Sequence, residues 1–198
     1  MISGPTRSGK TILTKAIIKH MNELIVPVPQ VVYWCYTEYQ DSYIELESWP
    51  NVILCEGFPE LALLKAGKSK PQLIVLDDMM TDCKKNEKLM QLFVKGSHHW
   101  NLSVIHIVQN AFYEGLRSAR INAQYLFLMK SPSDQLQIQT LARQLFPRNQ
   151  KYMTESYHDA TSNAHGYLLV DMNQYTPDNL RLRTNILPDQ LQIVYVAK

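Results

Sequence analysis

The feature that most limits the possible folds is an eight-residue motif near the start of the chain. Residues 4 to 11 read Gly-Pro-Thr-Arg-Ser-Gly-Lys-Thr, which fits the phosphate-binding pattern G-x-x-x-x-G-K-T. Glycines allow the backbone N–H groups of such a loop to face phosphate oxygens, and the dipole of the following helix adds positive potential. We therefore expect ATP to be bound by the whole loop, that is by Gly4, Pro5, Thr6, Arg7, Ser8, Gly9, Lys10 and Thr11.

Two side chains of the loop have individual expected roles. Lys10 should reach the β- and γ-phosphates, and the Thr11 hydroxyl should bind Mg²⁺. A chance match in a glycine-containing turn is the alternative, but a helical pattern of apolar residues follows directly over 11–25. In proteins with this motif the loop follows a core β-strand. Only residues 1–3 precede it here, so we expect a truncated N-terminal strand.

The rest of the chain alternates between strand and helix patterns. Strands are predicted at 31–36, 52–55, 73–76, 103–108, 125–129, 167–171, 180–184 and 193–196. Helices are predicted at 11–25, 59–66, 86–95 and 134–146. This alternation indicates an α/β fold with a mostly parallel sheet flanked by helices on both faces. The length of 198 residues suits a single domain over 1–198.

Composition limits the compartment and the partners. The 45% apolar and 19% charged residues are ordinary for a soluble protein, and a net charge of +2 provides no strong global attraction to nucleic acid or membrane. No apolar run approaches the roughly 18 residues that span a bilayer. Cys35, Cys55 and Cys83 form no C-x-x-C pair, which favours free thiols in a reducing, intracellular compartment over structural zinc.

A second motif consists of four apolar residues followed by two carboxylates, Leu73 to Asp78. This is the Walker B form, in which the strand end delivers Asp77 to the Mg²⁺ shell. Asp78 would then polarise the attacking water. Because many ATPases use Glu at this position, the shorter Asp78 could instead act only as an acceptor behind the metal ligands. An acidic turn that caps the strand in solvent is the structural alternative for the pair.

Polar and cationic side chains beyond this strand suggest further roles. Gln109 ends the apolar run 103–108, in the position where an amide senses the γ-phosphate; a strand-end cap is the alternative. Arg117 and Arg120 are candidates for a charge that stabilises the transferring phosphoryl group of a neighbouring subunit, although each could be a solvated surface residue. Arg143 and Arg148 flank a helix and are weaker candidates. Lysines that could contact DNA phosphates or form a solvated face are Lys65, Lys68, Lys70, Lys84, Lys85, Lys88 and Lys95. His98-His99 favours a loop or an interface over a metal site.

Several segments together resemble the viral genome-packaging ATPases of the FtsK–HerA superfamily, especially the poxvirus-type ATPases of Polinton/Maverick elements, adintoviruses and virophages. The segments that carry the resemblance are 4–11, 76–78, 93–99, 101–104, 109–112, 141–147, 159–161, 165–169 and 176–185. They cover nearly the whole chain.

The resemblance implies a RecA-like P-loop fold, a homo-oligomeric ring, and Mg²⁺- and ATP-dependent translocation of double-stranded DNA into a capsid through a portal-like vertex. It assigns Lys10 and Thr11 to Walker A, Asp77 and Asp78 to Walker B, and Gln109 to the sensor. Arg117 is the first choice for the arginine acting in trans, and Arg120 the second. The expected location is the nucleus or cytoplasm of a virus-infected cell, or the virion, without membrane association.

Three other functions remain open from the sequence. A HerA-like translocase of DNA repair or conjugation shares the mechanism but has another cargo. A small-molecule P-loop kinase would need an arginine-rich lid, which we do not find. A nucleotide-gated scaffold without turnover is disfavoured because the Walker residues are intact.

Overall fold

A computed structural model describes residues 1–79, 89, 91–112 and 116–197. By its internal contacts the chain forms two compact units, which are considered separately. The first contains Met1 and Thr11–Asn122, and the second contains Ile2–Lys10 and Ala123–Lys198.

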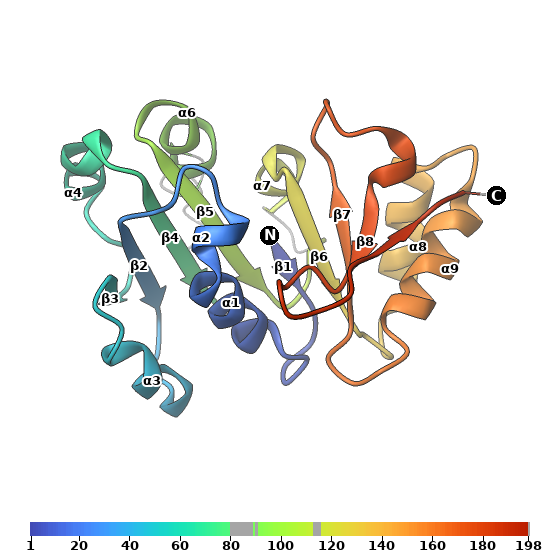
Figure 1. The fold of residues 1–198 in the computed structure, drawn as a ribbon, viewed down its shortest axis with the longest axis horizontal. Coiled ribbons are helices and arrows are strands. Elements are labelled where there is room, and N and C mark those ends of the chain that lie inside the picture. The colour runs from blue at the N-terminus through green and yellow to red at the C-terminus, as the bar shows by residue number, and fades with distance from the viewer. Residues whose placement is uncertain (80–88, 90, 113–115, 198) are drawn as a thin grey trace. The chain divides into compact units, whose positions relative to one another are not determined.

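The first unit is built on four parallel strands in the order β3-β2-β4-β5 (Figure 1). Their bounds are β2 Val31–Tyr36, β3 Val52–Glu56, β4 Gln72–Asp77 and β5 Leu102–Val108. All six residues of β4 are buried, as expected for a central strand of a parallel sheet. The register pairs Tyr36 of β2 with Asp77 of β4, and Asp77 with Ile107 of β5. The carboxyl ends of these strands therefore lie at one edge of the sheet.

Helices cover both faces of this sheet. On one face, Ile18 of α1 and Leu46 of α3 join Trp34 and Val75 in a buried core. On the other face, Phe93 of the π-helix η4 lies 6.2 Å, ring to ring, from His106 of β5. The helical elements of this unit are α1 Lys10–Lys19, α2 Met21–Leu24, η1 Asp41–Tyr43, α3 Ile44–Glu47, α4 Leu61–Ala66, η2 Gly67–Ser69, η4 Gln91–Gly96, α6 Ser97–His99 and α7 Arg117–Asn122.

The second unit carries the order β1-β6-β7-β8-β9. The strand β1, Ile2–Ser3, pairs in parallel with β6. The remaining pairs are antiparallel. The bounds are β6 Tyr125–Met129, β7 Tyr167–Asp171, β8 Leu182–Thr184 and β9 Ile193–Tyr195, with helices α8 Gln135–Leu145, α9 Gln150–Ala160 and η5 Asp178–Leu180. Figure 1 shows α8 and α9 beside β7 and β8.

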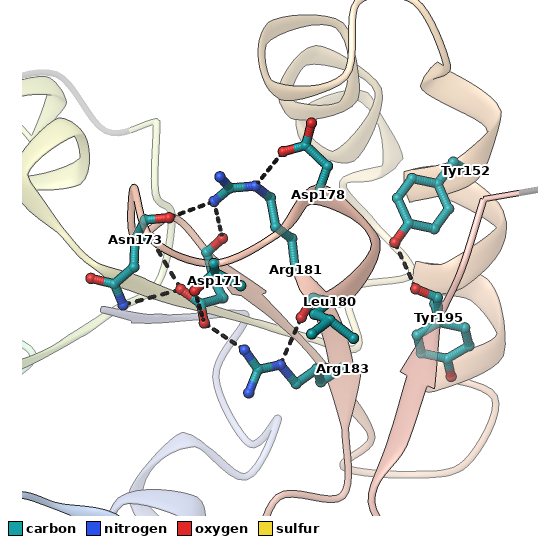
Figure 2. Close-up of polar contacts among 9 residues, drawn as sticks. Tyr152, Asp171, Asn173, Asp178, Leu180, Arg181, Arg183 and Tyr195 are labelled. Carbon is teal, nitrogen blue, oxygen red and sulfur yellow. Dashed lines mark hydrogen bonds and ion pairs between the residues drawn. The ribbon is translucent and has the colours of Figure 1, made fainter.

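A buried carboxylate fixes the connection between β7 and β8. Asp171, only 3% exposed, accepts from Arg183 at 2.6 Å (Figure 2). It also accepts from the Thr176 hydroxyl at 2.9 Å. Arg181 donates to the backbone oxygens of Asp171 and Asn173. Both arginines are thus held within their own chain, in a structural role.

The α/β fold with a mostly parallel sheet predicted from the sequence is confirmed. Strands 31–36, 125–129 and 167–171 coincide with the prediction. The helix predicted over 11–25 is divided at His20 into α1 and α2. The helix predicted over 86–95 lies partly outside the described residues; Leu89 is helical, and Gln91–Gly96 has π-helical hydrogen bonding.

Helices α7 and α9 and the short α3 were not predicted. The buried side of α9 is Tyr152, Met153, Ser156 and Tyr157, a face too polar for a hydrophobic repeat to reveal. Its N-terminus is capped by the Asn149 side chain, which accepts from the backbone N–H of Tyr152 at 3.2 Å.

Candidate nucleotide-binding site

The phosphate loop is a tight turn that depends on its glycines. The Ser8 N–H donates to the Pro5 oxygen at 3.2 Å, and Arg7 and Gly9 have φ angles of 63° and 97°. A Cβ on Gly4 would lie 2.6 Å from the Cβ of Met129 in β6. Glycine is therefore required at residue 4 for space and favoured at residue 9 for backbone conformation.

The loop fits a phosphate group. The Ser8 hydroxyl is buried and has no hydrogen-bond partner among the described residues. Lys10 donates from Nζ to the Gly4 oxygen at 2.7 Å and to the Pro5 oxygen at 2.8 Å. These bonds curl the ammonium group back over the loop, where the oxygens of a phosphate could replace the two carbonyls. A buried hydroxyl without a partner is expected where a ligand supplies the missing contact.

His165 is an unpredicted neighbour of the phosphate loop. A Cβ on Gly9 would lie 3.2 Å from both the Cβ and the Nδ1 of His165, so this exposed histidine packs against the loop backbone. His165 has a φ angle of 60°, and a Cβ on the following Gly166 would lie 2.5 Å from the Ala160 oxygen. The sequence signal was the His165-Gly166 pair, which belonged to a segment of the resemblance but had been given no role.

The carboxylate of Asp77, the candidate Walker B residue, lies beside the Thr11 hydroxyl within the first unit. Thr11 Oγ1 donates to Asp77 Oδ2 at 3.4 Å, although the two residues are 66 positions apart. Asp77 is the last residue of β4 and is only 4% exposed. Both groups carry the oxygen atoms that Mg²⁺ prefers as ligands. The same Asp77 oxygen also accepts from the hydroxyl of buried Tyr43 at 3.0 Å, a partner that was not predicted.

Asp78 and Gln109 lie together at the carboxyl ends of β4 and β5. The Gln109 amide nitrogen donates to Asp78 Oδ1 at 3.3 Å and to Oδ2 at 3.1 Å. Asp78 is exposed and has a φ angle of 51°, a conformation that aspartate tolerates better than most residues. The two consecutive carboxylates have different partners, because Asp77 accepts from Thr11 and Tyr43 whereas Asp78 accepts from Gln109.

The two candidate arginines of α7 differ in exposure. Arg117, the first residue of α7, is exposed. The Arg120 guanidinium stacks on Phe112 at 4.1 Å from the ring centroid, and its Nε and Nη1 atoms are buried without a hydrogen-bond partner in the described ranges. Burial, and then the charge of Arg117, lower the pKa of Arg120 from its ordinary value. The guanidinium of Arg117 is therefore exposed to solvent, whereas that of Arg120 packs against Phe112 of the same chain.

The lysines around β4 are only partly described. Lys68, Lys70 and Lys95 are exposed, and the ammonium of Lys65 lies 5.3 Å from the centroid of the Trp100 ring. Lys84, Lys85 and Lys88 lie outside the described residues, as does the side chain of His98. Arg143, in contrast, lines a groove of about 500 Å³ between α8 and α9 with Lys151 and His158.

Comparisons with known proteins identify the fold. No protein-family model matches the chain, and neither does any curated protein. The cytoplasmic domain of the Thermomonospora curvata type VII secretion ATPase EccC is similar in structure, with a TM-score of 0.59 and 11% identity over 98% of this chain. The cytoplasmic domain of EssC is similar with a TM-score of 0.52 and 12% identity over 99% of the chain.

These similarities establish the class of fold. The chain has the α/β architecture of a secretion ATPase's cytoplasmic domain, and it corresponds to 25% of the EccC chain and 38% of the EssC chain. Within the part of the chain that the structure describes, no helix is long and apolar enough to cross a bilayer.

Proposed function

We propose that this chain is a P-loop ATPase of the FtsK–HerA superfamily that binds ATP with Mg²⁺. The observation that carries the proposal is the approach of Thr11 Oγ1 to Asp77 Oδ2 at 3.4 Å. This contact joins the last residue of the G-x-x-x-x-G-K-T motif to the carboxylate that ends a buried strand. The fold, similar to that of a secretion ATPase, supports the same class.

Each residue of the site has a proposed task. The loop from Gly4 to Gly9 cradles phosphate oxygens, and Lys10 exchanges its bonds to the loop carbonyls for bonds to the β- and γ-phosphates. Thr11 and Asp77 would hold the Mg²⁺ shell, and the metal would neutralise charge on the phosphates. Asp78 orients and deprotonates the attacking water, with Gln109 as the polar group that reports on the γ-phosphate.

The proposed cargo is double-stranded viral DNA, translocated into a capsid by a homo-oligomeric ring. This part of the proposal relies on the resemblance of the sequence segments to packaging ATPases. In such a ring, exposed Arg117 of one subunit would supply positive charge to the phosphates bound by the next. The proposed place of action is the infected host cell, at the portal-like vertex of a preformed capsid.

A protein-translocating ATPase is the second candidate, because solved structures with this fold include the secretion ATPase EccC. The polymer that stimulates ATP turnover distinguishes a DNA motor from a protein translocase. A DNA motor is expected to accelerate with double-stranded DNA and not with unfolded polypeptide, whereas a protein translocase is expected to show the opposite preference. A HerA-like repair or conjugation translocase would also respond to DNA, and the genes beside this one would distinguish it from a packaging motor.

The test combines turnover with oligomer mass. ATPase rates are measured with and without double-stranded DNA for the wild type, Lys10→Ala and Asp77→Ala, and the mass of the assembly is determined in parallel. Loss of hydrolysis in both variants, together with DNA stimulation of an oligomeric wild type, would support the proposal. Near wild-type DNA-stimulated activity in either variant would exclude it.

A further inference from the structure

Tyr43 makes a contact with the Walker B carboxylate that the motifs do not include. Its hydroxyl donates to Asp77 Oδ2 at 3.0 Å, and the same oxygen lies 3.4 Å from Thr11 Oγ1. Tyr43 reaches this position from η1, 34 residues before Asp77 in the sequence. Its side chain is fully buried at 0% exposure.

An aromatic cluster fixes the Tyr43 ring. Its centroid lies 5.7 Å from that of Trp34, 5.3 Å from that of Tyr36 and 5.9 Å from that of Tyr39. Trp34 and Tyr36 belong to β2, the strand directly beside β4, so the ring is held by the same sheet that carries Asp77. The hydroxyl consequently has a fixed position relative to the carboxylate.

The hydrogen bond between Tyr43 and Asp77 can form in one direction, from the hydroxyl to the carboxylate. A tyrosine hydroxyl is protonated at neutral pH and a carboxylate oxygen can only accept, so Tyr43 is the donor and Asp77 the acceptor. A hydroxyl donating to an ionised carboxylate forms a charge-assisted hydrogen bond, roughly twice as strong as a neutral one. Asp77 itself is only 4% exposed, so water could not fully replace this bond.

We propose that Tyr43 is a positioning residue of the ATPase site, which orients the Asp77 carboxylate toward the Mg²⁺ shell. The inference rests on the proposed function, because it assigns Asp77 to magnesium. Hydrogen bonds from outside the metal's own ligands orient those ligands, and their loss typically weakens metal affinity or activity by about 10- to 100-fold. Tyr43 acts through Asp77 and needs no contact with the nucleotide.

Tyr43→Phe tests the proposal, and Tyr39→Phe is the matched control. Both variants remove one hydroxyl from the same aromatic cluster, but the exposed Tyr39 hydroxyl donates to Glu47. The free Mg²⁺ concentration at half-maximal turnover is measured, together with the thermal shift produced by ATP with Mg²⁺ and by ATP with EDTA. For Tyr43→Phe we expect about a 10-fold higher Mg²⁺ requirement, an unchanged shift with EDTA, and wild-type behaviour of Tyr39→Phe.

The outcomes separate the inference from the function on which it rests. If wild-type protein needs Mg²⁺ for turnover and Tyr43→Phe needs no more of it than Tyr39→Phe, the inference is wrong and the ATPase assignment stands. If the wild type shows neither ATP binding nor turnover, the assignment fails and the inference falls with it.

A double-variant cycle keeps the proposal testable if Tyr43→Phe does not fold. Asp77→Ala removes the acceptor, so adding Tyr43→Phe to it should leave the melting temperature unchanged. A further large loss of stability in the double variant would show that the hydroxyl acts through something other than Asp77, which would overturn the proposal.

Discussion

The amide of Gln109 donates hydrogen bonds to both carboxylate oxygens of Asp78, at 3.3 and 3.1 Å. The amide comes from the end of β5 and the carboxylate from the residue after β4, so the pair spans two neighbouring strands. In the proposed function the amide that responds to the γ-phosphate is thereby connected directly to the group that orients water.

Gln109→Ala should slow hydrolysis by about 100-fold, the typical effect of removing one aligned hydrogen-bond donor at a reacting centre. Nucleotide affinity should remain, because Gln109 does not belong to the phosphate loop. Single-turnover ATP hydrolysis measures the expected loss of rate, and a separate binding titration measures the nucleotide affinity. Gln139→Ala, which removes the same side chain from an exposed position on α8, is the control. Unchanged hydrolysis in Gln109→Ala would contradict the sensor role.

Gly9→Ala should abolish ATP binding. The residue has a φ angle of 97°, where a side chain costs roughly 1–2 kcal/mol, and the new methyl would meet His165 at 3.2 Å. Gly57→Ala is a matched control with a φ angle of 76° and no neighbour within 4 Å of its Cβ. Gly57→Ala should lose a similar amount of stability in urea unfolding and keep its ATP affinity. Equal ATP affinities of the two variants would contradict the requirement for glycine at residue 9 in ATP binding.

Arg117→Ala and Arg120→Ala should affect different properties, namely turnover and thermal stability. Because Arg120 stacks on Phe112 at 4.1 Å, its loss should lower the melting temperature. Exposed Arg117 should affect turnover of the assembly and leave the melting temperature unchanged. Mixing Arg117→Ala subunits with Asp78→Asn subunits should restore part of the activity, since some interfaces then combine an intact arginine with an intact carboxylate. An absence of restoration would count against action in trans.

Acid should destabilise the fold through His106. Burial is the main cause that lowers its pKa from 6.5 to about 3, and both ring nitrogens lack a hydrogen-bond partner among the residues described. The unfolded chain therefore binds this proton at higher pH than the folded chain. Stability is retained above pH 6.5 and falls toward pH 3, by up to about 1.4 kcal/mol per pH unit.

Replacing the buried imidazole tests this pH dependence. His106→Leu should flatten the decline in the free energy of unfolding between pH 6.5 and 4, measured by urea unfolding. His158→Leu, at an exposed position on α9, should retain the wild-type slope. Equal slopes for His106→Leu and the wild type would assign the acid sensitivity to other groups.

Arg183→Ala should destabilise the protein by about 3 kcal/mol, because it leaves the buried Asp171 carboxylate without its cation. Lys15→Ala removes a more exposed pair with Glu45 and should cost less than about 1 kcal/mol. Chemical denaturation of both variants checks the contrast. Comparable losses would show that Asp171 is stabilised by its other donors alone.

The sequence could predict those parts of the site that consist of residues adjacent in the chain. The glycine spacing of residues 4–11 predicts a phosphate-binding loop, and the apolar run before Asp77 predicts a buried strand with a carboxylate at its end. Strands of β-branched and aromatic residues such as 31–36 were likewise recognisable, because their burial in a parallel sheet requires continuous apolar sequence.

Other features were hidden because the residues concerned lie far apart in the chain. Helix α9 was missed, since its buried face includes serine and tyrosine. His165 lies against Gly9 although 156 residues separate them, and the following Gly166 packs too closely on the Ala160 oxygen to carry a side chain.

Local sequence thus determined the glycine-containing loop before α1, the paired carboxylates after β4 and the α/β class, because each depends on neighbouring residues and on burial. Tertiary structure alone decided the partners of the two carboxylates. Parallel pairing of β4 with β2 and β5 brought Tyr43 to Asp77 and Gln109 to Asp78, across 34 and 31 residues. No repeat or spacing encodes such contacts, since they arise only when strands distant in sequence align their carboxyl ends.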